Sequence, residues 1–237
     1  MFSAVSSGII REENILSAAM TDGKRRIMMD PKAMYAVSYG LYILTTRVSD
    51  RDNGCVTNTV GQVTSDPNRV TVAVNKANHT CGMIEKSGVF TASVISQDAS
   101  FDLFKRFGFQ NGRDTDKFAG FDHVRRVGNG TLAVTEGTNA FISARVEQAL
   151  DLGSHILFVA AVTDMDVLTK SPSATYTYYQ EHIKPRPRPA DTAQGGKTVW
   201  RCTVCGYEFV GEELPEGFIC PICKHPSSDF ERITAQG

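Results

Sequence analysis

Residues 202–223 read CTVCGYEFVGEELPEGFICPIC and contain two pairs of cysteines. Two residues separate the thiols within each pair, so each pair can place two sulfurs on one metal ion. Two such turns facing each other form a tetrahedral cage of four thiolates, a geometry that zinc and iron–sulfur sites share. The sequence therefore predicts a small metal-binding module at residues 198–237. Its expected ligands are Cys202, Cys205, Cys220 and Cys223.

The metal in this cage decides what the module does. Two cysteine pairs with this spacing most commonly form a structural zinc ribbon. Other features favour a redox iron: the segment is acidic, which suits docking to a redox partner protein. A segment of roughly forty residues cannot bury a sufficient core alone, so the metal must contribute folding energy. Aromatic side chains are dense around the cage, at Trp200, Tyr207, Phe209, Phe218 and Phe230.

The run Trp200–Phe230 resembles rubredoxin, in the short form found fused to other redox proteins. The matching residues are Cys202, Cys205, Gly206, Tyr207, Cys220, Pro221 and Cys223. The resemblance implies one iron ion that carries one electron at a time, with its potential tuned by hydrogen bonds to the sulfurs and by solvent exposure. The loop between the cysteine pairs is shorter than in free-standing rubredoxins, so we expect a more exposed metal pocket.

Composition limits the remaining possibilities. The chain has 237 residues, a net charge of -1 and 41% hydrophobic residues, with a pI near 6.5. These values fit one domain of roughly 150 residues plus a small module. No basic stripe suggests nucleic acid, and no apolar run approaches the roughly 20 residues that span a bilayer. Cys55 and Cys81 are isolated and are expected to be buried small hydrophobes. We expect a cytoplasmic protein.

The order of patterns along the chain predicts a mainly β domain at residues 29–183, after an N-terminal extension at 1–28. Asp30-Pro31 opens a helix that ends at Gly40. Short helices are expected at 78–87 and 102–107. A Pro- and Gly-rich linker is expected at 184–197, and it can be either a tether that lets the metal module move or a mere spacer. Strands dominate without a βαβ repeat, which predicts a mostly antiparallel barrel. The expected strands are 41–46, 69–75, 90–95, 142–147 and 156–163.

Two stretches of this domain carry polar groups suited to a cofactor, and each also has an ordinary explanation. Lys76, Asn78 and Thr80 stand where a strand meets a helix N-terminus, which can bind a phosphate. They can equally be a helix cap and a solvated lysine. Residues 53–67 are small, polar and β-prone, and can line a heteroaromatic ring or form an ordinary strand with a turn at Asp66-Pro67. The dinucleotide-binding and P-loop glycine motifs are absent from the sequence.

Together these stretches resemble the flavin reductase family with the FMN-binding split barrel, over about residues 30–179. The resemblance implies FMN near the interface of a homodimer, with NAD(P)H as the electron donor. The pieces that carry it are SYGLYILT (38–45), NTVGQVT (58–64) with Pro67, NKANHT (75–80), GSH (153–155) and YTYY (176–179).

The family implies roles for individual residues. Lys76, Asn78, His79 and Thr80 would hold the phosphate and ribityl chain, with Thr45 as a further cofactor contact. The isoalloxazine would face Asn58, Thr59, Gln62, Val63 and Thr64. The family places a Gly-Asp-His histidine near the nicotinamide, and His155 matches it, with Ser154 in place of the aspartate. His155 would be catalytic; the plain alternative is a histidine that starts a strand.

The order of the two domains resembles high-molecular-weight rubredoxins of anaerobic microbes. A nicotinamide delivers two electrons as a hydride, whereas a thiolate-bound iron accepts one, and a flavin joins the two. The fusion therefore predicts an FMN-dependent oxidoreductase that passes electrons from NAD(P)H to iron and on to a partner protein, by resemblance a flavodiiron oxygen or nitric oxide reductase. The alternatives are a carrier charged by a separate reductase, which Ser154 favours, and a flavin reductase with a zinc ribbon.

Overall fold

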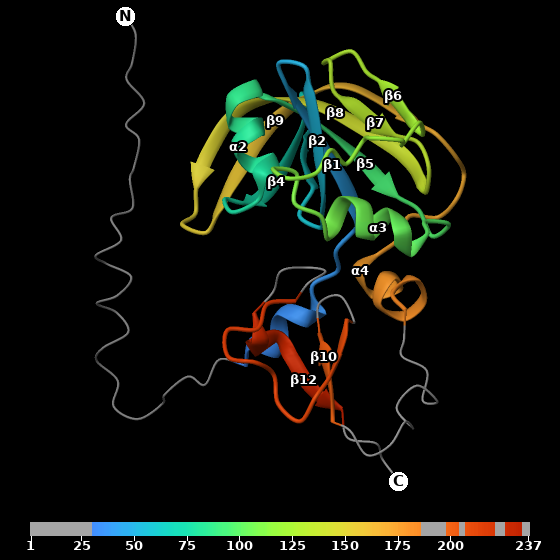
Figure 1. The fold of residues 1–237 in the computed structure, drawn as a ribbon. Helices are drawn as coiled ribbons and strands as arrows, with labels where there is room; N and C mark the ends of the chain where they lie inside the picture. Colours follow the sequence, from blue (N-terminus) through green and yellow to red (C-terminus); the bar gives the residue numbers. More distant parts are fainter. Residues whose placement is uncertain (1–29, 186–197, 204–206, 221–225, 234–237) are drawn as a thin grey trace, which may run out of the picture. The chain divides into compact units, whose positions relative to one another are not determined.

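The computed structural model describes residues 30–185, 198–203, 207–220 and 226–233 (Figure 1). The chain divides into two units, residues 1–37 and 38–237. The described part of the first unit is a short 3-10 helix, η1 (Pro31–Ala36). It begins at the predicted proline, but it ends at Ala36 rather than at Gly40. The predicted extension at 1–28 and most of the linker at 184–197 lie outside the described residues.

The second unit contains a seven-stranded antiparallel sheet, which confirms the predicted antiparallel barrel. Its order is β2-β1-β5-β8-β9-β4-β3. All five predicted strands are present, and the pattern underestimated the length of the β8–β9 hairpin. The strands are β1 (Tyr42–Val48), β2 (Arg51–Thr57), β3 (Gly61–Ser65), β4 (Asn68–Asn75), β5 (Val89–Ile95), β8 (Thr138–Asp151) and β9 (His155–Val167).

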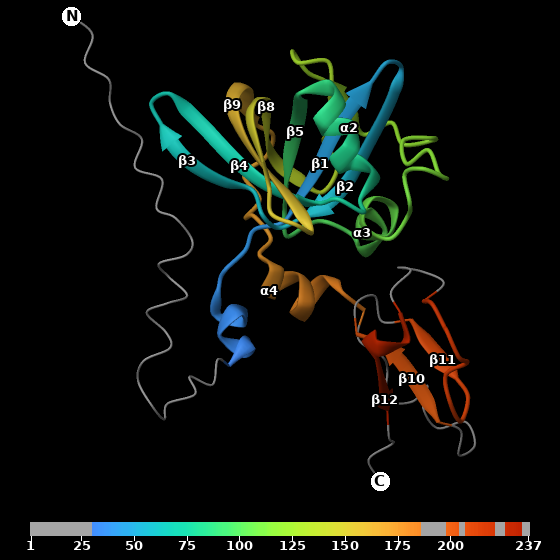
Figure 2. The ribbon, with the colours of Figure 1, turned by 90° about the vertical axis from the view of Figure 1, so that its left-hand side faces the viewer.

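The strands β2 and β3 follow each other in the chain but form opposite edges of this sheet. Residues 58–60 therefore cross from one edge to the other. The Thr59 hydroxyl donates a 2.7 Å hydrogen bond to the Ala73 carbonyl and accepts a 3.2 Å bond from the Ala73 amide. A side chain thus joins the crossing segment to β4. Figure 2 shows β3 and β4 as a long hairpin that extends beyond the other strands.

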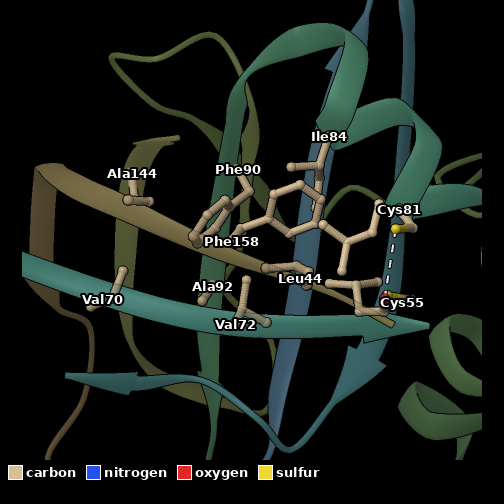
Figure 3. Close-up of a cluster of buried hydrophobic side chains, with 13 residues drawn as sticks. Leu44, Cys55, Val70, Val72, Cys81, Ile84, Phe90, Ala92, Ala144 and Phe158 are labelled. Carbon is tan, nitrogen blue, oxygen red and sulfur yellow. Dashed lines mark hydrogen bonds between the residues drawn. The ribbon is translucent and has the colours of Figure 1, made fainter. Parts of the chain in front are cut away.

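The main core fills the inside of the curved sheet. Val70, Val72 and Val74 alternate inward from β4, as the two-residue period predicts. Phe90 and Phe158 lie at the centre of this cluster (Figure 3). Cys55 is 3% and Cys81 1% exposed, so both are buried as expected. Burial raises the pKa of Cys55, and it raises that of Cys81 to about 11, which keeps both as neutral thiols.

Two α-helices cover the barrel close to their predicted positions. The helix α2 (His79–Ser87) starts after Asn78 and ends at Gly88, whose amide still bonds to the Ile84 carbonyl and whose left-handed φ of 69° then turns the chain out of the helix. The helix α3 (Phe101–Gly108) packs Leu103, Phe104 and Phe107 into a second core. The sequence patterns missed the hairpin β6 (Val124–Arg126)–β7 (Leu132–Val134), and α4 (Tyr176–Tyr178) with the following π-helix η2 (Tyr179–Ile183).

The C-terminal segment forms a separate three-stranded antiparallel sheet of order β11-β10-β12. Its elements are β10 (Val199–Cys202), β11 (Glu208–Val210), η4 (Ser227–Asp229) and β12 (Phe230–Ile233). No helix among the described residues is both long and apolar enough for a membrane span.

Candidate functional site

The turn between β4 and α2 is a compact set of backbone and side-chain hydrogen bonds. The Asn75 side chain accepts a 2.8 Å bond from the Ala77 amide. Asn78 is the helix N-cap, and its side-chain oxygen accepts a 3.0 Å bond from the Thr80 amide. The cap alternative for Asn78 is therefore observed. The remaining amides of the first helical turn point toward the N-terminal end of α2, where an anion is stabilised.

A cavity of about 360 Å³ lies at this end of α2. One side is formed by the end of β4 and the start of α2, another by β2, and the third by the loop that follows α3. The lining includes no carboxylate, although it contains the side chains of His79 and Lys117. The lining residues are Cys55, Val56, Asn75, Ala77, Asn78, His79, Phe107, Gly108, Phe109, Gln110, Asn111, Gly112 and Lys117.

The electrostatics of this cavity are positive. Partial burial lowers the pKa of His79 below its usual 6.5, and the charges of Arg113, Arg51, Lys86 and Lys117 lower it further. The imidazole is therefore neutral near pH 7, and the surrounding cations set the potential.

Lys117 is the most deeply buried charge at the cavity, with only 3% of its surface exposed. Its ammonium donates 2.9 Å and 3.0 Å hydrogen bonds to the carbonyls of Gly54 and Phe107. Burial lowers its pKa from the usual range. Lys117 does not stand out in the sequence, because a lysine in a charged run after Asn111-Gly112 is typical of a solvated loop.

The other residues expected at the flavin occupy different places. Asn58 and Thr59 lie on the segment that crosses between the sheet edges. On β3, Gln62 lines a second cavity of about 300 Å³, which is largely apolar. Val63 on the same strand is 53% exposed, and the Thr64 hydroxyl bonds to the Pro67 carbonyl at 2.5 Å.

Three expected site residues have partners away from both cavities. Thr45 is 1% exposed, and its hydroxyl donates to the carbonyls of Leu132 and Thr91. The Thr80 hydroxyl accepts a 3.0 Å bond from Asn53 and is fully buried. The Lys76 ammonium pairs with Asp151 at 2.5 Å.

His155 lies beside the β4–α2 turn, because it pairs with Asn75 in the β4–β9 ladder. The Lys76 amide also donates a 3.0 Å bond to the Ser154 carbonyl. The fold thus brings together the NKANHT and GSH pieces, which are far apart in sequence. The His155 Nδ1 atom lies 2.9 Å from the Ser154 hydroxyl. Among the described residues, its Nε2 atom has no hydrogen-bond partner.

The metal module places one cysteine of each pair in its interior. Cys202 and Cys220 are both fully buried, and they share a cluster with Phe230 and Phe218. The Cys202 amide donates a 2.8 Å bond to the Tyr207 carbonyl, which closes the first cysteine turn. A bridge between Ile219 and Pro226 flanks the second turn. Cys205 and Cys223 lie outside the described residues.

Comparison with known proteins agrees with this architecture. Residues 34–186 match the family model of the flavin reductase like domain. The chain belongs to the flavin reductase-like family. Residues 200–231 match a second model, the rubrerythrin, rubredoxin-like domain. The order of a flavin reductase-like domain followed by a rubredoxin-like domain is the one that the sequence predicted.

Two curated proteins share this family at substantial identity. High molecular weight rubredoxin of Moorella thermoacetica is 36% identical over 230 residues, which cover 86% of this chain and 100% of that protein. A ferric-chelate reductase (NAD(P)H) of Archaeoglobus fulgidus is 36% identical over 165 residues, covering 70% of this chain and 96% of the relative. Among solved structures, an FMN-binding protein from Thermus thermophilus has a TM-score of 0.52 at 24% identity, covering 61% of this chain and 81% of the other, and shares the fold.

The flavin reductase-like family is one of FMN-dependent oxidoreductases, and the rubredoxin-like domain holds one iron ion. The described residues fit both groups. Cys202 and Cys220 are buried sulfurs from two separate turns, as a four-thiolate iron site requires. The larger cavity offers polar backbone, an N-capped helix start and a buried ammonium to a phosphate-bearing cofactor. The rubredoxin-like match favours iron over the zinc ribbon.

Proposed function

We propose that the protein passes electrons from NAD(P)H, by way of FMN, to an Fe(Cys)4 centre and on to a protein acceptor such as a flavodiiron oxygen or nitric oxide reductase. The observation that carries the proposal is the presence of both domains on one chain. A bound flavin supplies the conversion between hydride transfer and single-electron transfer. The domains are assigned to residues 29–183 and 198–237, joined by a linker at 184–197 that follows an extension at 1–28.

The residues of the barrel would bind and orient the cofactor and the donor. Asn78 and His79 line the larger cavity, so they would meet the phosphate end of FMN, with Lys76 and Thr80 in the same turn. Thr45, which is buried in the barrel interior, would be a further contact of the cofactor site. The isoalloxazine would face Asn58, Thr59, Gln62, Val63 and Thr64. His155 would orient the nicotinamide through its Nε2 atom, and Ser154 would hold the ring by its Nδ1 atom.

The metal module would bind iron through Cys202, Cys205, Cys220 and Cys223. Two of these sulfurs are buried, which shields the metal from water and limits the reorganisation that accompanies a change of charge. The acidic residues of the module would steer it toward a basic patch on the acceptor. The isolated thiols of the barrel and the absence of a paired-disulfide pattern support a reducing cytoplasm.

We also propose that the protein is a homodimer. Support comes from the apolar cavity at the barrel, which includes Val60, Ile142 and Val162, and from Met165 on its border, 58% exposed. Light scattering should give twice the chain mass. Met165→Lys should shift the protein toward monomer, whereas Val210→Lys, which alters an equally exposed side chain of the metal module, should not. A monomeric mass for the unaltered protein would remove the dimer from the proposal.

The electron-transfer proposal is tested by anaerobic titration with NADH and NADPH, following the visible spectrum. Bleaching of flavin and iron bands in the same titration supports an internal path. A Cys220→Ser variant without iron should still show flavin bleaching, which separates the first transfer from the second. Flavin bleaching with a persistent ferric band in the unaltered protein would contradict transfer from flavin to iron.

Ser154 favours a second candidate function. The family's aspartate is absent there, and a serine bonds His155 instead. The protein would then be a carrier that a separate reductase charges. If neither nucleotide bleaches a protein that contains both cofactors, and a reduced partner protein does, the carrier function replaces the enzyme function.

A further inference from the structure

The ammonium of Lys117 has no opposite charge to compensate it. It is almost completely buried, and its hydrogen bonds go to two neutral carbonyls, those of Gly54 and Phe107. Among the described residues, no carboxylate forms an ion pair with it, and burial lowers its pKa. A buried charge without a counter-ion costs free energy. Because Lys117 lines a cavity, a ligand can supply that counter-ion.

Two arginines reinforce this charge at the edge of the same cavity. The Arg51 guanidinium donates 2.7 Å and 3.2 Å bonds to the carbonyls of Gly112 and Arg113. The Arg113 guanidinium donates a 3.1 Å bond to the Ala77 carbonyl. Gly112 and Ala77 both line the cavity. Each arginine uses a minority of its five donors in these bonds, so donors remain for a ligand.

These three cations differ in their partners from six other cations of the barrel. Arg47, Arg69 and Lys76 each pair with a carboxylate, as do Lys105, Arg125 and Arg126. Across the described residues, Arg51, Arg113 and Lys117 form no such pair. The lysine that the sequence suggested for phosphate, Lys76, is neutralised by Asp151. The unpaired positive charge at the cavity therefore comes from β2 and from the loop after α3, and Lys86 of α2 adds to it at His79.

The cavity chemistry suits a phosphate group. Guanidinium groups match two phosphate oxygens at once, and a lysine acts as a point charge beside them. The first amides of α2 add donors of the same sign. We propose that Lys117, Arg51 and Arg113 form a cationic subsite that binds the phosphate monoester of a nucleotide. The identity of that nucleotide rests on the proposed function. The phosphate is either the 5′-phosphate of FMN or the 2′-phosphate of NADPH.

The test compares ligands that differ only in the phosphate. Flavin-depleted protein is titrated with FMN and with riboflavin by fluorescence, and the holoenzyme is assayed with NADPH and NADH. The variants are Arg113→Gln, Arg51→Gln and the double variant, with Lys105→Gln as a matched loss of charge on α3. The arginine side chains are exposed, so these variants should fold. Lys117→Met is added, and its folding is checked by circular dichroism before titration.

If the flavin phosphate occupies the subsite, each arginine variant weakens FMN binding about tenfold, since charged hydrogen bonds are lost. Riboflavin binding then changes less than about twofold, as expected for a ligand without the charge. If the dinucleotide phosphate occupies it, the NADPH preference in kcat/KM falls by a similar factor while the FMN to riboflavin ratio stays constant. Both outcomes support the subsite and identify its source.

The subsite is overturned if both ratios stay constant in the double arginine variant, which includes an equal loss of FMN and riboflavin affinity with an unchanged NADPH preference. Equal loss would mean that the arginines only hold the loop in place. The affinity titrations contain no reductant. Failure of electron transfer to iron would therefore contradict the proposed function and leave the affinity result standing.

Discussion

The side-chain amide of Asn53 donates a 3.0 Å hydrogen bond to the hydroxyl of Thr80, and both side chains are buried. This bond joins β2 to the first turn of α2, two elements that form different sides of the larger cavity. The cavity thus depends on a contact between residues that neither cap the helix nor line the opening.

Replacing Thr80 by valine should destabilise the barrel. Valine keeps the shape of threonine but leaves the Asn53 amide without its acceptor, which costs about 1–3 kcal/mol in the free energy of unfolding. Urea denaturation of the flavin-depleted protein measures this loss as a lower midpoint at constant m. Thr80→Ser keeps the hydroxyl and should recover most of the lost stability. A valine variant as stable as the serine variant would mean that the bond contributes nothing.

Gly112 should be intolerant of a side chain. A Cβ atom at this position would meet the Asn53 Oδ1 atom at 2.1 Å, so either the loop or the Asn53–Thr80 bond must shift. Overpacking of this kind costs about 1–3 kcal/mol, and we expect Gly112→Ala to weaken flavin binding as well. Gly128→Ala is the matched control, since nothing lies within 4 Å of its added Cβ. Equal melting temperatures and FMN affinities for the two variants would contradict the prediction.

Local patterns in the sequence predicted most of the barrel. The alternation of Val70, Val72 and Val74 identified β4 and its buried face, and the Asn78 cap identified the start of α2. The crossing at residues 58–60 was missed, because a polar stretch with strand propensity does not reveal that its two halves lie on opposite sheet edges. That arrangement depends on how the sheet closes.

The candidate site was less accessible to sequence reasoning than the fold. The family resemblance selected His79, which lines the cavity, and Lys76, which pairs with Asp151. It did not select Lys117, whose burial results from packing of the loop after α3 against β2. Charge type can be seen in a sequence, whereas the presence or absence of a counter-charge depends on tertiary contacts.

Removing Arg113 should raise the pKa of His79. Burial is the largest cause of its lowered pKa, and Arg113 is the largest of the charges that add to it. A histidine whose pKa is lower in the folded state contributes stability above its usual 6.5, and this contribution is lost as the pH falls through the lowered pKa. NMR titration of His79 should show an upward shift in Arg113→Gln and none in Lys105→Gln. An unchanged His79 titration in Arg113→Gln would place the arginine charge away from the imidazole.

Loss of a buried cysteine should remove iron without removing flavin. Cys220→Ser deletes one buried sulfur of the metal module, and the small sheet β11-β10-β12 has little other core. We expect loss of the visible iron band and of iron by elemental analysis, with FMN content retained. Cys81→Ala, which alters a buried thiol of the barrel, should keep full iron content. Stoichiometric iron in Cys220→Ser would rule out this cysteine as a ligand.

The pairing of His155 with Ser154 leads to the final prediction. If His155 orients the nicotinamide, His155→Ala should slow anaerobic flavin reduction by NAD(P)H about tenfold or more, since a misplaced donor loses its reactive geometry. FMN affinity should stay constant, because His155 lines neither cavity.

Ser154→Asp restores the family's carboxylate beside the His155 Nδ1 atom. The carboxylate would fix the tautomer and the orientation of the imidazole ring, so flavin reduction should be faster. Stopped-flow absorbance measures both rates. An unaltered reduction rate in His155→Ala would remove the histidine from donor binding. If Ser154→Asp is then still faster than the unaltered protein, Ser154 limits flavin reduction without acting through His155.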